Sequence, residues 1–249
     1  VSAVYNNAGL GAIDLQGMID KLAKRPLETQ PGAAWDYGPS VNIQGYVVEK
    51  LSGQSLDVYF DEHIFRPLGM VDTGFHIASE KAPRVVAIHS FDEAGVLSGP
   101  AENRVTTEAP QFLSGSGGLM STAGDYWRFA QALLNGGELD GARILKPETV
   151  ELMRTSVLPA DAKGDLYGPS QEGIGFGMDF AIVEDPAVAS TKQGLNTFYW
   201  GGAFGTWFWI DPTNDLIFVG MIQNRDGSRP DAGTPPTRSV SADLVYSAL

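Results

Sequence analysis

The last third of the chain constrains the fold most strongly, because its apolar residues fall in short runs separated by turn signals. Asp185-Pro186 and Asp211-Pro212 interrupt these runs. Strands are expected over residues 174–183, 196–202, 206–210 and 216–222. Connections this short suit antiparallel neighbours, whereas parallel neighbours need a long crossover. We therefore predict an antiparallel meander, which a helix over residues 239–249 follows.

The first two thirds of the chain favours helices. Apolar residues recur at helical spacing over residues 10–27, 41–51 and 56–65. Ser40 is expected to cap the second of these helices, since serine side chains accept hydrogen bonds from the first backbone N–H groups of a helix. Thr122 suits the same role for a later helix, and Pro147 suits the first position of a short one.

These patterns predict an α/β protein of the α+β kind with two units. A mainly helical, loop-rich unit is expected over residues 1–170, and a unit of antiparallel strands with a C-terminal helix over residues 171–249. A few strands and one helix leave part of such a sheet without a covering layer. The sheet is therefore expected to be incomplete in this chain.

Charge and composition exclude several functions. The 30 Asp and Glu residues outnumber the 17 Lys and Arg residues, which gives a formal net charge of -13. Nucleic-acid binding and binding to anionic membrane surfaces both rest on clustered basic residues, so neither is expected. No apolar run approaches the roughly 18 residues of a membrane-spanning helix. Cysteine is absent, which removes disulfides and thiolate catalysis.

The sequence motifs predict no cofactor and no metal. The three histidines lack the i, i+4 spacing of a helical metal pair. The run from Gly173 to Gly177, GIGFG, is not the dinucleotide motif G-x-G-x-x-G, and it indicates close backbone packing in a sheet. Asp57, Asp61 and Glu62 are typical of a solvated helix face.

Two segments remain as candidates for chemistry. Tyr37 lies in the stretch PGAAWDYG, where it is either a core aromatic or a general base. A phenol is a poor base at neutral pH unless a cation favours its ionised form. Gly201, Gly202 and Gly205 interrupt the most strand-like segment, NTFYWGGAFGTWFWIDP. They indicate either a bulge or tight bend, or a strand edge without side chains, where backbone N–H groups face a developing oxyanion.

Four stretches in a fixed order carry a resemblance to a known superfamily. They are PGAAWDYGPSVNIQGYVVEKLSGQSLDVYFDEHIFRPLGM, SGSGGLMSTAGDYWRFAQALLNGGELDG with the helix start ILKPETVELM, GIGFGMDFAIVEDP, and YWGGAFGTWFWIDP. In these stretches the chain resembles the C-terminal two thirds of the serine β-lactamase-like superfamily. That superfamily includes class C β-lactamases, D-peptidases and the family VIII carboxylesterases. The resemblance implies a β-lactamase/transpeptidase-like fold.

The resemblance also assigns roles by position. Tyr37 matches the tyrosine of the Y-x-N motif, which acts as general base together with the lysine of S-x-x-K. Trp200, Gly201 and Gly202 occupy the place of K-T-G on the strand that lines the site. The backbone N–H of Ala203, the next residue, matches one oxyanion-hole donor. The W-G-G sequence, with tryptophan in place of the lysine, is similar to the variant found in family VIII esterases. This resemblance favours esters over β-lactams as substrates.

Two departures from the superfamily pattern matter. The third position of Y-x-N is Pro39 instead of asparagine, and Asn42 in the following helix is a candidate to replace that amide. In addition, none of the seven lysines has Ser or Thr three positions before it, so the chain contains no S-x-x-K. The nucleophilic Ser and its Lys are therefore expected in an N-terminal segment of the same protein that lies outside this chain.

The resemblance implies a serine carboxylesterase that hydrolyses short-chain or small aromatic esters through an acyl-serine intermediate. This chain by itself is expected to be inactive. Trp200 is the expected apolar wall for the substrate. Four neighbouring aromatic residues are further candidates for such a pocket: Phe198, Tyr199, Phe204 and Trp207.

Other functions stay open at this stage. A β-lactamase or D-amino-acid peptidase would need a cation near Trp200, and the nearest lysine in sequence is Lys192. A non-catalytic ligand-binding homologue, or an inactive fragment, is the alternative from another class.

Overall fold

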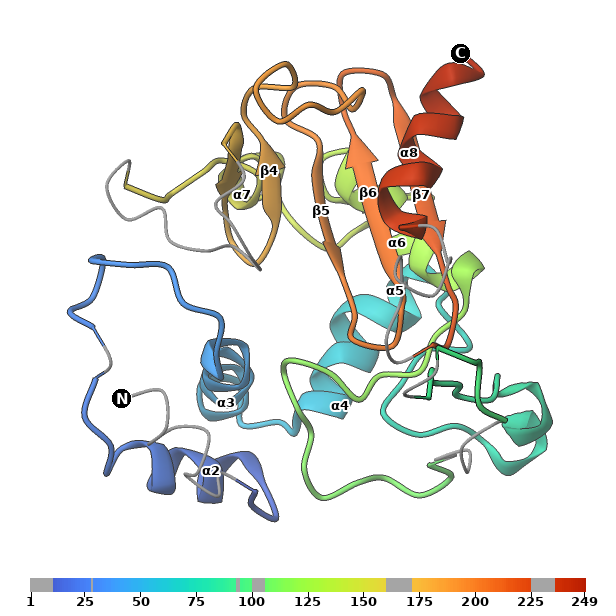
Figure 1. Ribbon diagram of the computed structural model, residues 1–249. Helices are drawn as coiled ribbons and strands as arrows, with labels where there is room; N and C mark the ends of the chain where they lie inside the picture. Colours follow the sequence, from blue (N-terminus) through green and yellow to red (C-terminus); the bar gives the residue numbers. More distant parts are fainter. Residues whose placement is uncertain (1–10, 28, 93–94, 100–105, 160–171, 225–235) are drawn as a thin grey trace.

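An antiparallel sheet lies between two layers of helices (Figure 1). The computed structural model describes residues 11–27, 29–92, 95–99, 106–159, 172–224 and 236–249. Helix α8 (Thr237–Ser247) lies on one face of the sheet, and α6 (Ala123–Leu134) and α7 (Pro147–Met153) lie on the other (Figure 1). None of the helices in these ranges is long and apolar enough to cross a membrane.

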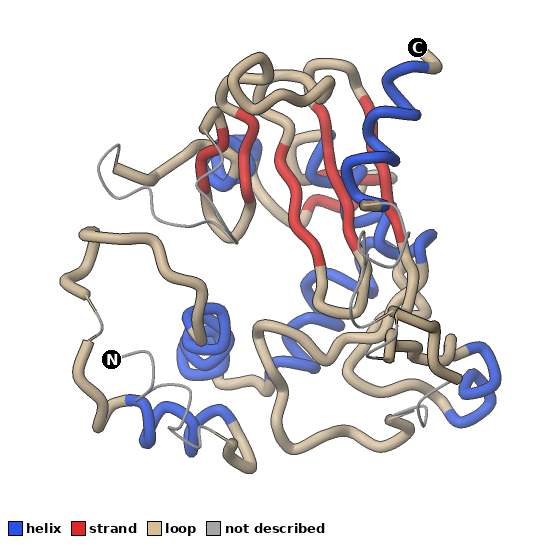
Figure 2. Tube along the Cα trace, viewed as in Figure 1, coloured by secondary structure: helices blue, strands red, loops and turns tan. Residues whose placement is uncertain are grey.

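The sheet confirms the predicted antiparallel meander. Its strand order is β3-β4-β5-β6-β7, and each strand is antiparallel to the next (Figure 2). The strands are β3 (Ile174–Phe176), β4 (Ala181–Val183), β5 (Phe198–Gly201), β6 (Trp207–Asp211) and β7 (Leu216–Gly220). β5 is therefore the central strand of this sheet, with a partner on each side.

The first predicted strand, over residues 174–183, is wrong in one respect, because it is a hairpin of two strands. The chain turns between β3 and β4, where Asp179 has φ 62°. Gly177 lies so close to the end of α7 that a Cβ would come within 2.2 Å of the Met153 carbonyl oxygen. At Gly175 a Cβ would lie 2.4 Å from Ser156 Oγ. The close backbone packing predicted for these glycines is therefore confirmed.

The side chains of β6 alternate between the two helical layers. Phe208 and Ile210 belong to a buried cluster under α6 and α7. On the opposite face, Trp207 Nε1 donates to Ser241 Oγ in α8 at 3.2 Å. The buried cluster contains Ala130, Leu133, Val150, Phe180, Ile182, Phe198, Phe208 and Ile210. Helices that precede residue 170 thus cover the sheet that follows it, and the predicted boundary between two units stays a prediction.

The remaining helices lie below the sheet as drawn in Figure 1. They are α2 (Leu15–Leu22), α3 (Ser40–Ser52), α4 (Leu56–Phe60), the π-helical turn η1 (Asp61–Phe65), α5 (Arg66–Leu68) and the 3-10 helix η2 (Ser79–Arg84). A short strand pair, β1 (Glu138–Leu139) and β2 (Ala142–Arg143), follows α6.

Of the two predicted helix caps, Thr122 is confirmed and Ser40 is wrong. Ser40 is the first residue of α3 rather than its cap, because the preceding Pro39 occupies the cap position and supplies no side-chain hydrogen bond. Thr122 caps α6 as predicted, since its hydroxyl accepts from the Asp125 backbone N–H at 3.1 Å. Pro147 is the first residue of α7, which also confirms its prediction.

A buried carboxylate connects α8 to the ends of the strands. Asp211 is 0% exposed. Its carboxylate accepts hydrogen bonds from the backbone N–H groups of Gly194 (2.8 Å) and Thr213 (2.9 Å). It also accepts from the Asn214 side chain (2.8 Å) and from the Tyr246 hydroxyl of α8. Burial acts to raise the pKa of the Asp211 carboxyl, but the hydrogen bonds favour its charged form and hold the pKa below its usual value.

Substitution of Asp211 by Asn should destabilise the protein that carries this chain and change its response to acid. Loss of charge-assisted hydrogen bonds in a buried site costs about 2 kcal/mol of unfolding free energy at pH 7. Because the pKa of Asp211 is lowered on folding, its stabilisation is present above about pH 4 and is lost as the pH falls through the folded-state value. The difference between wild type and Asp211→Asn should therefore shrink below pH 4 in urea unfolding.

Asp215→Asn is the matched control, because Asp215 is exposed in the same turn and the substitution removes the same charge. It should change the unfolding free energy little at any pH. A gap between wild type and Asp211→Asn that stays constant from pH 7 to pH 3 would contradict the assigned role of the carboxylate.

Candidate active site

The structure brings Tyr37 and Trp200 into contact. Tyr37 lies just before α3, and its ring stacks on the Trp200 ring of β5, with centroids 6.1 Å apart and planes inclined by 23°. Trp35 lies 6.2 Å from Tyr37 and 5.2 Å from Phe176, and Phe176 lies 5.5 Å from Trp200. These four residues, the aromatic cluster, form a closed circuit of ring contacts between the segment before α3 and the sheet.

The aromatic cluster holds Tyr37 in place without burying it. Tyr37 is 54% exposed, while each aromatic pair contributes about 1 kcal/mol beyond the area that it buries. A general base needs this combination, because it must be fixed in position and still meet a proton on a bound substrate or nucleophile. The sequence did not single out Trp35 and Phe176, although both lie inside the quoted stretches PGAAWDYG and GIGFG.

The packing of the backbone explains why glycines follow Trp200. Gly201 is the last residue of β5, and a Cβ there would lie 2.7 Å from Arg238 Cζ in α8. A Cβ at Gly202 would lie 2.4 Å from Thr206 Oγ1. The turn that follows closes with a hydrogen bond from the Gly205 N–H to the Gly202 carbonyl at 3.1 Å. Tight backbone packing therefore accounts for these glycines, and a role of Gly201 and Gly202 in substrate binding stays a prediction.

Ala203 occupies the second position of this turn and is exposed. The hydrogen bond that closes a four-residue turn uses the carbonyl of its first residue and the N–H of its fourth, so the second N–H takes no part in it. Within the described residues, no acceptor receives a hydrogen bond from the Ala203 N–H. The amide is thus available for the predicted role as an oxyanion donor.

Asn42 lies in the first turn of α3 and binds a neighbouring loop. Its side-chain oxygen accepts from Ser114 Oγ at 2.8 Å, from the Ser116 backbone N–H at 3.2 Å and from Ser116 Oγ at 3.3 Å. Between these serines, a Cβ at Gly115 would come within 2.2 Å of the Val41 carbonyl oxygen. Asn42 therefore fixes the 114–116 loop against α3, and its predicted contact with substrate stays a prediction.

The other aromatic residues of the segment divide between the core and the surface. Phe198 is only 2% exposed and belongs to the buried cluster under α6 and α7. Tyr199 points to the other face of β5, where burial raises the pKa of its hydroxyl to about 12. Tyr199 therefore stays protonated at neutral pH. Phe204 is 41% exposed in the turn, and Trp207 packs on Phe218 at 5.6 Å.

The cation beside this segment is not the one nearest in sequence. Lys192 Nζ donates to Ser247 Oγ at 2.7 Å, at the far end of α8. Arg238 in the first turn of α8 instead reaches the end of β5, where its Nη2 donates to the Gly202 carbonyl oxygen at 2.8 Å. Arg238 could not be predicted from the sequence, because no local pattern links the start of a helix to a strand that precedes it by more than thirty residues.

A hollow of about 630 Å3 lies next to the aromatic cluster. Trp35 and Phe176 form part of its wall, together with Ser40 and Gln44 of α3 and Asp179 of the β3–β4 turn. Gln44 Nε2 donates to Asp179 Oδ1 at 3.4 Å, which connects the helical part to the sheet across this hollow. Its volume falls within the usual range for a small-molecule site.

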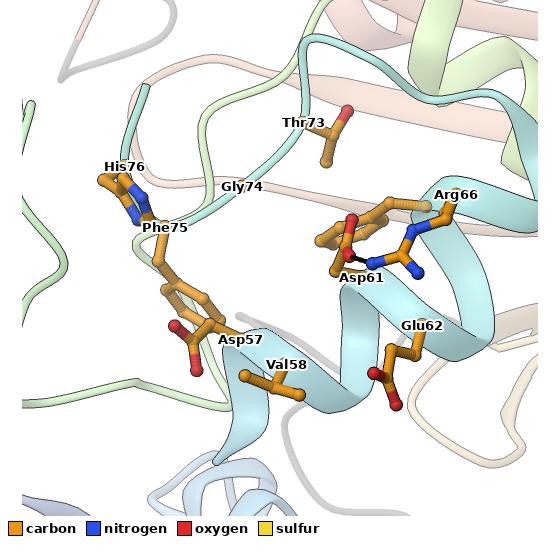
Figure 3. A pocket seen from close by; sticks show the side chains of 10 residues that line it. Asp57, Val58, Asp61, Glu62, Arg66, Thr73, Gly74, Phe75 and His76 are labelled. Atoms are coloured by element: carbon orange, nitrogen blue, oxygen red, sulfur yellow. Dashed lines mark hydrogen bonds and ion pairs between the residues drawn. The ribbon is translucent and has the colours of Figure 1, made fainter. Parts of the chain in front are cut away.

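A second hollow, of about 490 Å3, lies away from the aromatic cluster between the α4–η1 segment and residues 73–76 (Figure 3). Asp57, Asp61 and Glu62 line it, and Asp61 pairs with Arg66. No group of three or more side chains that could hold a metal ion occurs in the described part of the chain. These acids contact none of the predicted site residues in the contacts that the structure shows.

Similarity to known proteins extends over nearly the whole chain. The Beta-lactamase family model matches residues 3–242. Protein Rv1367c of Mycobacterium tuberculosis is 38% identical over 208 residues, which cover 82% of this chain and 52% of the relative. Esterase EstB of Burkholderia gladioli is 31% identical over 233 residues, which cover 83% of this chain and 55% of the relative. The chain thus spans about half the length of these curated relatives.

Solved structures show the same fold. EstCE1, described as a hydrolase with promiscuous acyltransferase activity, aligns with a TM-score of 0.78 at 25% identity, over 95% of this chain and 62% of that one. Simvastatin synthase (LovD) from Aspergillus terreus aligns with a TM-score of 0.76 at 22% identity, over 94% of this chain and 61% of that one. The family match over residues 3–242 shows that the chain belongs to the Beta-lactamase family, within the serine β-lactamase-like superfamily.

Proposed function

We propose that the protein carrying this chain is a serine carboxylesterase of the family VIII type, which hydrolyses short-chain or small aromatic esters. The observation that carries this proposal is the stacking of Tyr37 on Trp200, 6.1 Å between centroids, on the strand that leads into the Ala203 turn. A candidate base, an apolar wall and a backbone N–H donor are thus joined through β5. The serine and lysine come from a segment of the protein outside this chain.

The proposed reaction has two steps, acylation of the serine and hydrolysis of the acyl-serine. In the first, Tyr37 in its ionised form takes the proton of the serine hydroxyl while Oγ bonds to the ester carbonyl carbon. The carbonyl oxygen becomes an oxyanion beside the Ala203 N–H, and the carbon–oxygen bond to the alcohol then breaks. The departing alkoxide takes the proton back from Tyr37. In the second step, water replaces the alcohol, and the same sequence releases the acid and restores the serine.

Three lines of support favour esters as substrates. Trp200 presents an aromatic ring where the superfamily's K-T-G motif has a lysine ammonium for an anionic substrate. Esterase EstB and a lovastatin esterase of Penicillium rubens, 28% identical over 228 residues, are relatives with esterase names. The hollow of about 630 Å3 beside Trp35 and Phe176 also gives an acyl or alcohol group an aromatic wall.

A substrate with a carboxylate, such as a β-lactam or a D-amino-acid peptide, is the second candidate. Arg238 is the observation that favours it, because its guanidinium lies against Gly201. The guanidinium already donates to the Gly202 carbonyl, however, and it lies on the face of β5 opposite Trp200. We therefore rank this candidate below an ester.

Replacement of Tyr37 by Phe tests the proposed base. In the protein that carries this chain, kcat/KM for p-nitrophenyl butyrate should fall by about 100- to 10,000-fold, because general-base catalysis is lost while the ring contacts remain. Tyr59→Phe is the matched control, since the Tyr59 ring packs on His63 in α4–η1, away from the site. Unchanged turnover in Tyr37→Phe would exclude the phenol as the base.

Replacement of Trp200 by Lys tests the preference for esters. The variant should hydrolyse p-nitrophenyl butyrate about tenfold more slowly, because it loses aromatic contacts worth about 1 kcal/mol each. It should bind an anionic cephalosporin more tightly than wild type in competition assays. Trp200→Phe keeps a ring without adding a cation, and it should retain most of the esterase activity. Equal ester turnover in Trp200→Lys and wild type would mean that Trp200 does not line the substrate site.

Labelling with a fluorophosphonate tests where the nucleophile lies. The complete protein should gain one covalent phosphonyl group by intact-mass measurement, because the reagent captures an activated serine. The isolated 249-residue chain should gain none and should not hydrolyse nitrophenyl esters. Rapid labelling of the isolated chain, for example at Ser114 or Ser116, would overturn the assignment of the nucleophile to another segment.

A further inference from the structure

We propose that Arg238 is a positioning residue that strengthens the oxyanion donor of Ala203. This inference rests on the proposed function, because it acts on the same turn. Arg238 Nη2 donates to the Gly202 carbonyl oxygen at 2.8 Å and lies 3.5 Å from the Thr206 carbonyl oxygen. The Thr206 carbonyl accepts from the Gly202 N–H at 2.7 Å. One guanidinium therefore reaches both carbonyl groups at the base of the turn.

The hydrogen bond to the Gly202 carbonyl also affects the next backbone amide, the Ala203 N–H. The Gly202 carbonyl and the Ala203 N–H belong to the same planar, conjugated peptide group. Hydrogen bonds with a charged donor are roughly twice as strong as neutral ones, and bonds in a chain polarise one another by about 10–30%. A cation on the carbonyl oxygen thus draws electron density from the amide nitrogen. The Ala203 N–H becomes a better donor to an oxyanion.

The sequence and the packing both keep the guanidinium in this place. Gly201 leaves the space that Arg238 fills, since a Cβ there would lie 2.7 Å from Cζ. Further along α8, Ser241 Oγ accepts from Trp207 Nε1, and the Tyr246 hydroxyl donates to Asp211. Helix α8 is therefore attached to the sheet at several points. Little reorganisation is needed when charge develops on the substrate.

No carboxylate among the described residues forms an ion pair with Arg238. An anion that shared the guanidinium would weaken its effect on the Gly202 carbonyl. Arg238 is exposed, and solvent screens its field. The expected effect is therefore smaller than the loss of a whole oxyanion donor.

The test is steady-state kinetics of the complete protein on a neutral ester, p-nitrophenyl butyrate. Arg238→Gln should lower kcat about tenfold with KM within about twofold, because the lost interaction strengthens only in the transition state; removal of an entire donor costs about 100- to 1000-fold. Arg238→Ala should regain part of its kcat when guanidinium chloride is added at millimolar concentration. Affinity for a boronic acid that mimics the tetrahedral intermediate should fall in parallel with kcat.

Two further variants separate positioning from a general structural role. Ser241→Ala removes a different contact between α8 and the sheet and a bond to the Arg238 backbone carbonyl. It leaves the Arg238 guanidinium and the Gly202 carbonyl in place, so kcat should stay within about twofold of wild type. Gly201→Ala should displace the guanidinium and lower kcat. When Gly201→Ala is added to Arg238→Gln, kcat should fall little further, because both substitutions act on the same interaction.

Several results would overturn the proposal. The proposal fails if Arg238→Gln keeps the wild-type kcat. It also fails if Ser241→Ala lowers kcat as much as Arg238→Gln does. A loss confined to the KM of anionic esters would assign Arg238 to substrate binding instead. If thermal unfolding shows that Arg238→Gln does not fold, wild-type kcat in a folded Gly201→Ala variant, which displaces the guanidinium, would be decisive against the proposal.

Tyr37→Phe, measured in parallel, distinguishes this inference from the proposed function. If the wild-type protein does not hydrolyse neutral esters, the proposed function fails. If wild type is active and Tyr37→Phe is not, while Arg238→Gln keeps its full kcat, only the inference about Arg238 fails.

Discussion

The site depends on the central place of β5 in the sheet. β5 pairs with β4 through Tyr199 and Phe198, and with β6 along its whole length. Phe198 is buried in the largest core cluster, so the strand is held by two ladders and by its own first side chain. A slip of one residue would exchange the two faces of the strand and move Trp200 away from Tyr37. The register of β5 therefore fixes the geometry of the candidate site.

The two faces of β5 carry different parts of the proposed chemistry. Successive side chains of a strand point to opposite faces, so Trp200 meets Tyr37 on one side while Gly201 meets Arg238 on the other. The base and the apolar wall thus lie apart from the cation. The two sides come together at the Ala203 turn, because one peptide group there carries both the carbonyl that Arg238 binds and the N–H that is proposed as the oxyanion donor.

Helix α8 has a role beyond covering the sheet. Its first turn supplies Arg238 to the turn after β5, and its last turn supplies Tyr246 to the buried Asp211 at the end of β6. The same helix therefore stabilises both ends of the strand pair that frames the Ala203 turn. A buried carboxylate with all its hydrogen bonds made resists displacement, since breaking them leaves a charge without partners. This rigidity suits an oxyanion donor that must be in place before the reaction starts.

The sequence by itself determined the parts of this protein that rest on local signals. Short runs and turns predicted the antiparallel meander, the Thr122 side chain predicted a helix start, and the quoted stretches identified the superfamily. The hairpin around Asp179 was missed, because no Gly-Pro or Asn-Gly pair marks that turn. Only the tertiary structure decided that Arg238 meets Gly202. The bond is made to a backbone carbonyl, a group that every residue carries, so no sequence pattern records which carbonyl the folded chain places within reach.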